Sequence, residues 1–244
     1  MGEAIAKIAD AASWKLRTLL RTTRFFDVIE MVNLYKSRVL GYIECKTAAI
    51  YHAARSELQR IDRVQNAFLR NAGISEMEAI CFFRLAPLCS RRDMALPGVI
   101  HRTVLGHGPE QFKKFIRPAR TCNHMGRESE RRHNRQLETH RVGKYMEIVG
   151  NSMLGLIDVY NLLPSQIVAM ETVQKFQGQL QIQLIEAAKR NEPNWRDLYS
   201  PRLAIYAHPL RKHVRPGNEK EAVLATTNVN EKAKCISGWL SFAQ

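Results

Sequence analysis

Residues 34–70 read LYKSRVLGYIECKTAAIYHAARSELQRIDRVQNAFLR, and large apolar side chains recur there at the three- and four-residue spacing of amphipathic helices. The first half, extended back to Asp27, predicts a helix to about Ala53 with the buried stripe Val28, Val32, Tyr35, Val39, Ile43 and Ile50. The second half predicts a helix that Gly73 closes, because glycine readily takes left-handed geometry at a helix end. Its inward residues are Leu58, Ile61, Val64, Phe68 and Leu69. Both stripes need apolar partners, so this stretch predicts a helical bundle.

The flanking sequence is also helical in pattern. Residues 3–22 predict an amphipathic helix whose buried stripe is Ile5, Ile8, Ala12, Leu16 and Leu19. Further helices are expected from Ser75 through Arg84, from Ser90 onward, and from Thr172 to Arg190, the last with the stripe Phe176, Leu180 and Leu184. The predicted fold class is therefore all-α.

Capping boxes and one proline indicate where these helices begin or bend. The capping-box pattern occurs at Asp27-x-x-Glu30, Ser56-x-x-Gln59 and Ser75-x-x-Glu78. Pro97 lies inside the helix expected from Ser90, where it removes a hydrogen bond and clashes with the preceding turn. We therefore expect a kink or a break near Leu96.

Four regions are expected along the chain. Residues 1–116 predict a helical domain, and 152–210 predict a smaller helical extension. Between them, 117–151 reads as a basic linker, because residues 117–144 hold eight Lys/Arg, three Glu and few large apolar side chains. Residues 211–244 are expected to be a tail of low order.

Composition favours a polyanionic partner. The chain has 244 residues, with 37 Lys+Arg against 23 Asp+Glu and a net charge of +14, a field that attracts nucleic acid or an anionic membrane surface. No apolar window approaches the roughly 18 residues of a membrane span, and no signal peptide follows Met1. Five cysteines without close pairing fit free thiols in a reducing compartment. An intracellular protein, nuclear or cytoplasmic and without a membrane partner, is expected.

Three basic groups are candidates for nucleic-acid binding. They are Lys7, Arg17 and Arg21 beside Trp14 on the first helix, Arg60, Arg63 and Arg70 on the outer face of the 58–70 helix, and Arg91 with Arg92 near the start of the next long helix. Cations can follow phosphates while an aromatic ring stacks on a base. A solvated helix back explains the first group as well. A carboxylate such as Asp93, or water, would serve Arg91 and Arg92 as well as a phosphate.

Other site chemistries are disfavoured. Cys122-x-His124, with His133 and His140, raises a zinc-knuckle hypothesis, but the spacing matches no standard zinc pattern and a basic loop is favoured. The chain has no Gly-x-Ser-x-Gly elbow and no Walker-type loop. His101 is expected to be a structural histidine. No metal, cofactor or catalytic residue is predicted.

Several of these motifs together resemble a known family. LYKSRVLGYIE (34–44), LQRIDRVQNAFLR (58–70), RRDMALPGVIHRTVLG (91–106) and the later YNLLP (160–164) and FQGQLQ (176–181) occur in this order. They resemble the region that follows the polymerase palm in reverse transcriptases of non-long-terminal-repeat (LINE-like) retrotransposons. The resemblance covers about residues 5–116 and 152–210, and it departs from the family at Pro97, where an aliphatic residue is usual.

The resemblance implies a thumb-like helical bundle with an extension, a part that grips template and primer. RNA or an RNA/DNA hybrid is then the expected partner, together with a palm-bearing polymerase portion. DNA synthesis is not expected, because the palm uses paired carboxylates to hold two metal ions, whereas this chain has six aspartates, none adjacent, and no Tyr-x-Asp-Asp. If the basic face of the first helix is only a solvated helix back, Trp14 is expected to pack against the palm. The alternative function is an interaction remnant of a decayed retroelement with no selected nucleic-acid activity, in which loss of the palm leaves apolar surface uncovered and promotes self-association.

Overall fold

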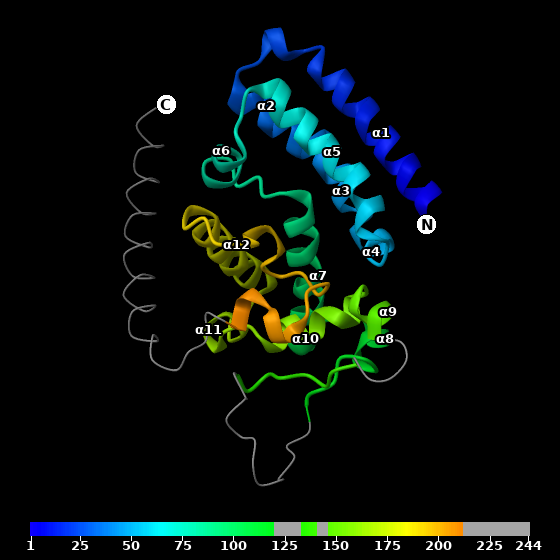
Figure 1. Ribbon diagram of the computed structural model, residues 1–244, viewed down its shortest axis with the longest axis vertical. Coiled ribbons are helices and arrows are strands. Elements are labelled where there is room, and N and C mark those ends of the chain that lie inside the picture. The colour runs from blue at the N-terminus through cyan, green and yellow to red at the C-terminus, as the bar shows by residue number, and fades with distance from the viewer. Residues whose placement is uncertain (120–132, 141–145, 212–244) are drawn as a thin grey trace. The chain divides into compact units, whose positions relative to one another are not determined.

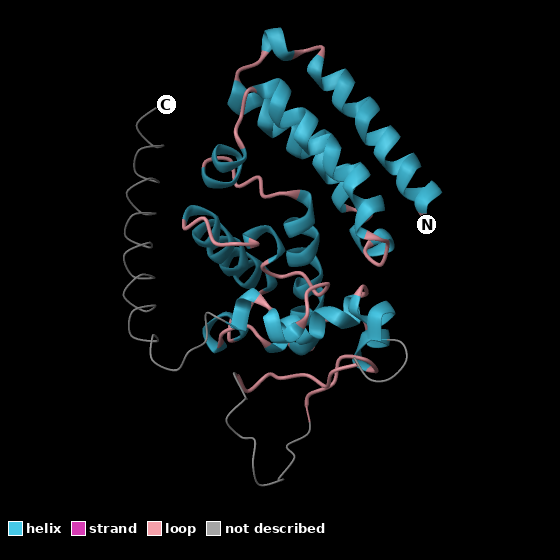
Figure 2. Ribbon diagram, in the orientation of Figure 1, coloured by secondary structure: helices cyan, strands magenta, loops and turns pink. Residues whose placement is uncertain are grey.

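The described part of the computed structural model is helical. It comprises residues 1–119, 133–140 and 146–211, and within these ranges there is no strand, only an isolated antiparallel bridge between Pro118 and Leu137 (Figure 2). This confirms the predicted all-α class. Met1–Leu210 form one unit and Arg211–Gln244 another. The predicted tail lies, apart from Arg211, outside the described residues.

The first half of the unit holds three long helices and several short ones (Figure 1). In chain order these are α1 (Gly2–Leu20), η1 (Thr23–Phe25), α2 (Val28–Tyr35), the π-helical η2 (Lys36–Leu40), α3 (Gly41–Glu44), α4 (Thr47–Ile50), α5 (Arg55–Ala72), α6 (Glu76–Cys81), α7 (Leu88–Val104) and α8 (Glu110–Lys113).

The second half is built around one long helix. Its elements are α9 (Met146–Gly150), η5 (Met153–Gly155), α10 (Leu156–Asn161), α11 (Ser165–Val168), α12 (Val173–Lys189), η6 (Trp195–Asp197), η7 (Ile205–Ala207) and η8 (Pro209–Arg211).

Two of the three predicted capping boxes are present. The Asp27 carboxylate accepts a hydrogen bond from the backbone N–H of Glu30, the Glu30 side chain accepts one from the N–H of Asp27, and the Ser75–Glu78 pair repeats this arrangement. The box predicted at Ser56 is wrong, because α5 begins two residues earlier than that box requires, with Ala54 as its N-cap and no side-chain cap. Gly73 ends α5 in the left-handed conformation, as predicted (φ +67°).

The helix predicted from Asp27 to Ala53 is divided. A π-helical turn replaces α-helix at Lys36–Leu40, and a turn at Cys45–Lys46 separates α3 from α4. The predicted stripe is buried except for Val28, which lies exposed at the first position of α2.

One apolar cluster joins α1, α2–α4 and α5, which lie side by side in Figure 1. Ile5, Ala12, Leu16 and Leu19 of α1 are buried there as predicted, whereas Ile8 is only partly buried. The Tyr35 and Phe68 rings stack with their centroids 4.1 Å apart. This packing leaves the opposite face of α1 in solvent.

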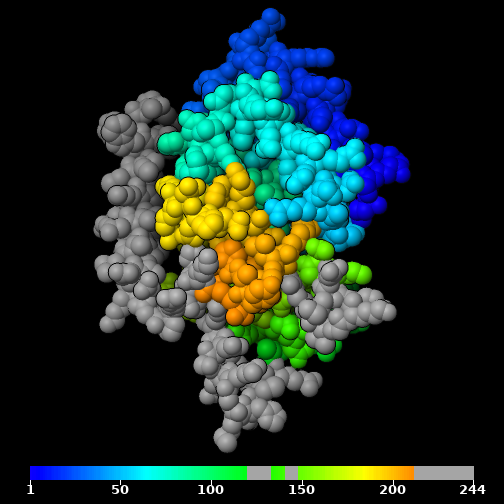
Figure 3. All heavy atoms as spheres, in the orientation of Figure 1, coloured from blue at the N-terminus to red at the C-terminus, as the bar shows by residue number. Residues whose placement is uncertain are grey.

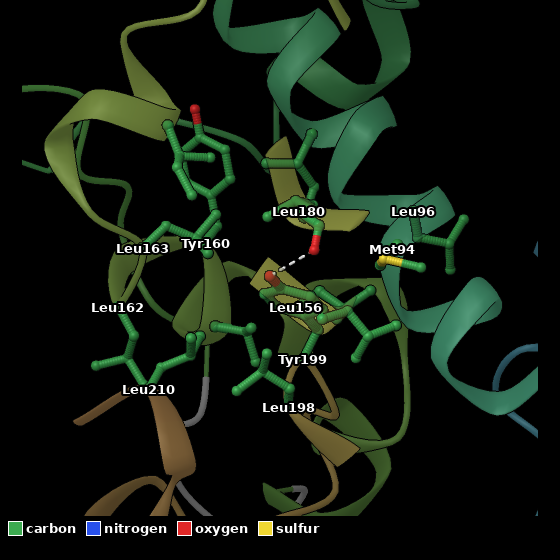
Figure 4. Packing of buried hydrophobic residues seen from close by; sticks show 14 of the residues in the cluster. Met94, Leu96, Leu156, Tyr160, Leu162, Leu163, Leu180, Leu198, Tyr199 and Leu210 are labelled. Atoms are coloured by element: carbon green, nitrogen blue, oxygen red, sulfur yellow. Dashed lines mark hydrogen bonds between the residues drawn. The ribbon is translucent and has the colours of Figure 1, made fainter. Parts of the chain in front are cut away.

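A second apolar cluster joins α7, α10, α12 and the segment 195–210 (Figure 4). The Tyr199 hydroxyl donates a hydrogen bond to the Leu180 carbonyl at 2.9 Å. His101 is fully buried between the Tyr160 hydroxyl, 3.0 Å from Nδ1, and the Met170 carbonyl, 2.9 Å from Nε2, so the predicted structural role is confirmed.

The cluster boundaries differ from the sequence regions. Met94, Leu96 and Ile100 of α7 belong to the second cluster, although the sequence of α7 was assigned to the first region, and only Leu88 of α7 is in the first cluster. Leu137 from the predicted linker is buried in the second cluster too.

Helix α7 continues through Pro97, so of the predicted kink or break near Leu96, the break does not occur. Pro97 is buried, and the next residue, Gly98, lies against α12, where a Cβ would come within 2.3 Å of the Gln177 Nε2 atom. Gln177 also donates to the Ala95 carbonyl at 3.3 Å. Helix α7 is therefore packed closely against α12 at the point where Pro97 removes a backbone hydrogen bond.

Candidate nucleic-acid interface

The outer face of α1 carries the first candidate group. Lys7, Trp14, Arg17 and Arg21 are all exposed, and the Trp14 side chain is 63% exposed. Lys7 Nζ lies 2.8 Å from Glu3 Oε1, and the exposed Asp10 follows Lys7. The N-terminal half of this face is therefore close to neutral.

The C-terminal half of the same face is cationic. Arg17 and Arg21 form no ion pair with any residue that the structure describes. Between residues 14 and 38 the basic side chains outnumber the acidic ones by six to two. The two acids are Asp27 and Glu30, and both carboxylates are held in the capping box of α2. Positive charge at this end of α1 is thus largely uncompensated.

An apolar hollow lies beside this cationic end. We call it the α1–α2 groove; its volume is about 350 Å³, and its lining includes Trp14, Lys15, Leu19, Phe26, Leu34 and Arg38. Sequence reasoning missed the groove, because it depends on how α1 and α2 pack against each other. The adjacent Phe25 and Phe26, both exposed and both directly after Arg24, were the available signal.

The second candidate group lies on α5. Arg60 Nη1 is 3.7 Å from Glu57 Oε2. Arg63 and Arg70 are exposed and form no ion pair within the described ranges. Both line a cavity of about 610 Å³ between α5, the start of α7 and residues 196–202. Figure 3 shows α5, coloured cyan, next to the yellow-to-orange segment that contains these residues.

Most other arginines of this cavity are paired with carboxylates. Arg55 Nη2 lies 3.0 Å from Asp197 Oδ2, and Arg196 Nε donates to Glu76 Oε1 at 2.7 Å. The Arg55 guanidinium thereby joins α5 to η6, and the Arg196 guanidinium joins η6 to α6. Arg63 and Arg70 remain available for an external anion.

The third candidate group is turned toward the protein's own carboxylates. Arg92 is only 4% exposed and forms two hydrogen bonds to Asp62, at 2.7 and 3.0 Å. Arg91 Nε donates to Glu44 Oε1 at 2.5 Å. Asp93, the carboxylate considered from the sequence, instead accepts from the Tyr51 hydroxyl at 2.5 Å. Of the explanations left open for Arg91 and Arg92, a carboxylate partner is the one observed, and we leave both residues out of the interface.

Metal-binding geometry is absent from the residues that can be assessed. No group of three or more His, Cys, Asp or Glu side chains in the described ranges could hold a metal ion. Cys122 and His124 lie outside those ranges. The Nε2 atom of His133 lies 3.2 Å from the Tyr160 backbone carbonyl oxygen. The Nε2 atom of His140 lies 2.6 Å from the Phe115 backbone carbonyl oxygen.

Among the described helices, none is both long enough and apolar enough to cross a membrane. Comparisons with protein-family models, with curated proteins and with solved structures find no match to this chain. Interpretation of the site therefore depends on its own geometry and on the sequence motifs.

Proposed function

We propose that this chain binds nucleic acid through the phosphate backbone, as the post-palm part of a LINE-like reverse transcriptase. The observation that carries the proposal is the pair of exposed, unpaired arginines at positions 17 and 21, next to the exposed Trp14. Four residues along a helix correspond to about 6 Å, so both guanidiniums extend from the same side of α1. Such a pair suits successive contacts along one strand.

Arg63 and Arg70 supply a second contact. They are two turns apart on α5, which packs directly against α1. Four phosphate contacts give an expected slope of about −3.6 for the logarithm of the binding constant against the logarithm of the salt concentration. This assumes roughly −0.9 for each phosphate neutralised on duplex DNA. The expected slope is far below the slope that all the charge of a +14 chain would give.

The proposed role is grip and not synthesis. The expected ligand is RNA or an RNA/DNA hybrid, and a palm-bearing portion would supply the polymerase carboxylates. Phosphate contacts position the strand without reading its bases. We therefore expect little sequence preference.

The test is fluorescence anisotropy of a labelled RNA/DNA primer–template duplex over a salt series. Arg17→Ala/Arg21→Ala should reduce the magnitude of the salt slope by about two and weaken binding at every salt concentration. The matched control is Lys175→Ala/Lys189→Ala, which removes the same charge from exposed positions of α12. Equal effects of the two double variants would show a general electrostatic attraction and refute the proposed interface.

Exposed apolar side chains favour a second candidate, the interaction remnant. Phe25, Ile29 and Phe82 are 66%, 61% and 79% exposed, which is unusual for rings and large aliphatic groups that no partner covers. Sedimentation velocity distinguishes the two candidates. Concentration-dependent self-association together with weak binding that disappears at moderate salt would favour the remnant.

A further inference from the structure

We propose that the α1–α2 groove takes an unpaired nucleobase of a strand whose phosphates lie on Arg17 and Arg21. The chain would then prefer single-stranded nucleic acid, or a frayed strand end, over a fully paired duplex. This inference depends on the proposed function and adds the ligand group that the groove would recognise.

Shape and chemistry of the groove fit a base. Its volume of about 350 Å³ is within the range of roughly 300–1,000 Å³ found for small-molecule pockets. Trp14 contributes an aromatic wall from α1, Phe26 contributes a second from the residue that precedes the α2 cap, and Leu19 and Leu34 complete the apolar lining. Flat aromatic ligands bind such surfaces by stacking.

The two aromatic rings are exposed to solvent. Trp14 is 63% exposed and Phe26 is 40% exposed, and both line the groove. A base seated between them would remove apolar surface from water on both sides. Burial of that surface is favourable, and it would be gained only when the ligand is bound.

The charges around the groove favour an anionic ligand. Lys15 and Arg38 are in the lining, and no carboxylate is. Arg17, next to Lys15 in sequence, and Arg21 continue the positive charge along α1. A strand with its base in the groove would place its flanking phosphates close to these cations.

The same charges disfavour a second copy of this chain as the occupant. Two identical surfaces facing each other would bring Lys15 and Arg38 of both copies together, with no carboxylate in the lining to offset them. The two acids between residues 14 and 38, Asp27 and Glu30, are held in the α2 capping box. Like charges across an interface are destabilising.

A paired base cannot use the groove. In a duplex each base is stacked on both faces, and only an unpaired base offers a free π-face to an aromatic side chain. Preference for unpaired strands is therefore the expected consequence of a base-stacking groove.

The test compares two strands that differ only in their bases. The wild-type chain is titrated into a labelled oligothymidylate and into an abasic strand of the same length, which carries the same phosphates. Stacking on one base should make the oligothymidylate bind about tenfold tighter. Trp14→Leu should abolish that difference while leaving affinity for the abasic strand and its salt slope unchanged, and Trp14→Phe should preserve the difference.

Two further readings make the result specific. Tyr206→Leu removes another highly exposed aromatic ring, at 84% exposure, and should change neither affinity. Quenching of tryptophan fluorescence by the oligothymidylate should occur in the wild type and be lost in Trp14→Phe.

Each failure has a distinct signature. Equal wild-type binding of both strands would overturn the base-stacking proposal and leave phosphate binding intact. No binding of either strand near physiological salt would overturn the proposed function itself. A dimer that Trp14→Leu dissociates and that oligothymidylate does not disturb would assign the groove to a second copy and overturn this proposal.

Discussion

Asp93→Asn should remove the part of the pH dependence of protein stability that arises from one buried carboxyl group. Asp93 is 3% exposed on α7, and the Tyr51 hydroxyl donates to its Oδ1 atom at 2.5 Å. The pKa of the Asp93 carboxyl is raised to about 6, and burial is the largest cause. The Tyr51 hydrogen bond and the nearby Arg202 and Arg92 guanidiniums act in the opposite direction and lower this pKa. Asp197 contributes a small further rise in the pKa.

The direction of the effect follows from proton binding. The Asp93 pKa is about 6 in the folded chain, against an ordinary value of 3.8. Between these two values the folded state binds more protons than the unfolded state, so stability falls as pH rises. A shift of about two units corresponds to about 3 kcal/mol, because one pKa unit equals 1.36 kcal/mol. The wild type is therefore penalised by that amount at pH 7 relative to pH below about 4.

Asparagine keeps the shape and an acceptor for Tyr51 but cannot ionise. Urea unfolding followed by circular dichroism between about pH 4 and 7 gives both free energies of unfolding, and other carboxylates cancel in their difference. The free energy of unfolding of the wild type, minus that of Asp93→Asn, should decrease by about 2 kcal/mol over this range, because the unfolded carboxyl is already partly ionised at about pH 4. Asp10→Asn, at an exposed position of α1, is the control and should show no comparable change. A constant difference, or one that increases with pH, would refute the reasoning.

Three further substitutions test the packing by urea unfolding. Phe176→Ala, at a fully buried position of α12, should cost about 3–5 kcal/mol, and an unchanged midpoint would contradict the second apolar cluster. Gly73→Ala should cost about 1 kcal/mol, because φ is +67° there although space is open; a stabilised variant would be inconsistent with the left-handed cap. Arg92→Ala should cost about 3 kcal/mol by leaving Asp62 without its guanidinium, and Arg92→Met/Asp62→Leu should recover most of that loss.

Local signals predicted the elements that depend only on neighbouring residues. The Asp27–Glu30 and Ser75–Glu78 boxes and the left-handed Gly73 were all identified correctly, since each joins groups within three residues or depends on one backbone conformation. The box at Ser56 failed because Ala54, with ψ 146°, is the last non-helical residue and therefore becomes the N-cap two residues earlier. A pattern of residue types does not fix which position becomes the N-cap.

Contacts between distant residues explain the larger errors. Helix α7 is continuous through Pro97 and packs there against α12, whose Gln177 reaches the Ala95 carbonyl from 82 residues away. Propensity alone predicted a kink or a break, because it counts the lost hydrogen bond and omits tertiary packing. The Arg92–Asp62 pair, 30 residues apart, was likewise beyond any local pattern.

The distribution of arginines is the strongest link between this fold and the proposed grip. Arg55, Arg92 and Arg196 are held by carboxylates of other elements, so their charge is largely neutralised before any ligand arrives. Arg17 and Arg21 lie instead on the solvent-facing side of α1, and the acids that follow them in sequence, Asp27 and Glu30, are held in the α2 capping box. A net charge of +14 does not distinguish these two sets. Their exposure and pairing do, and they concentrate the available charge beside an aromatic groove that is lined in part by α1.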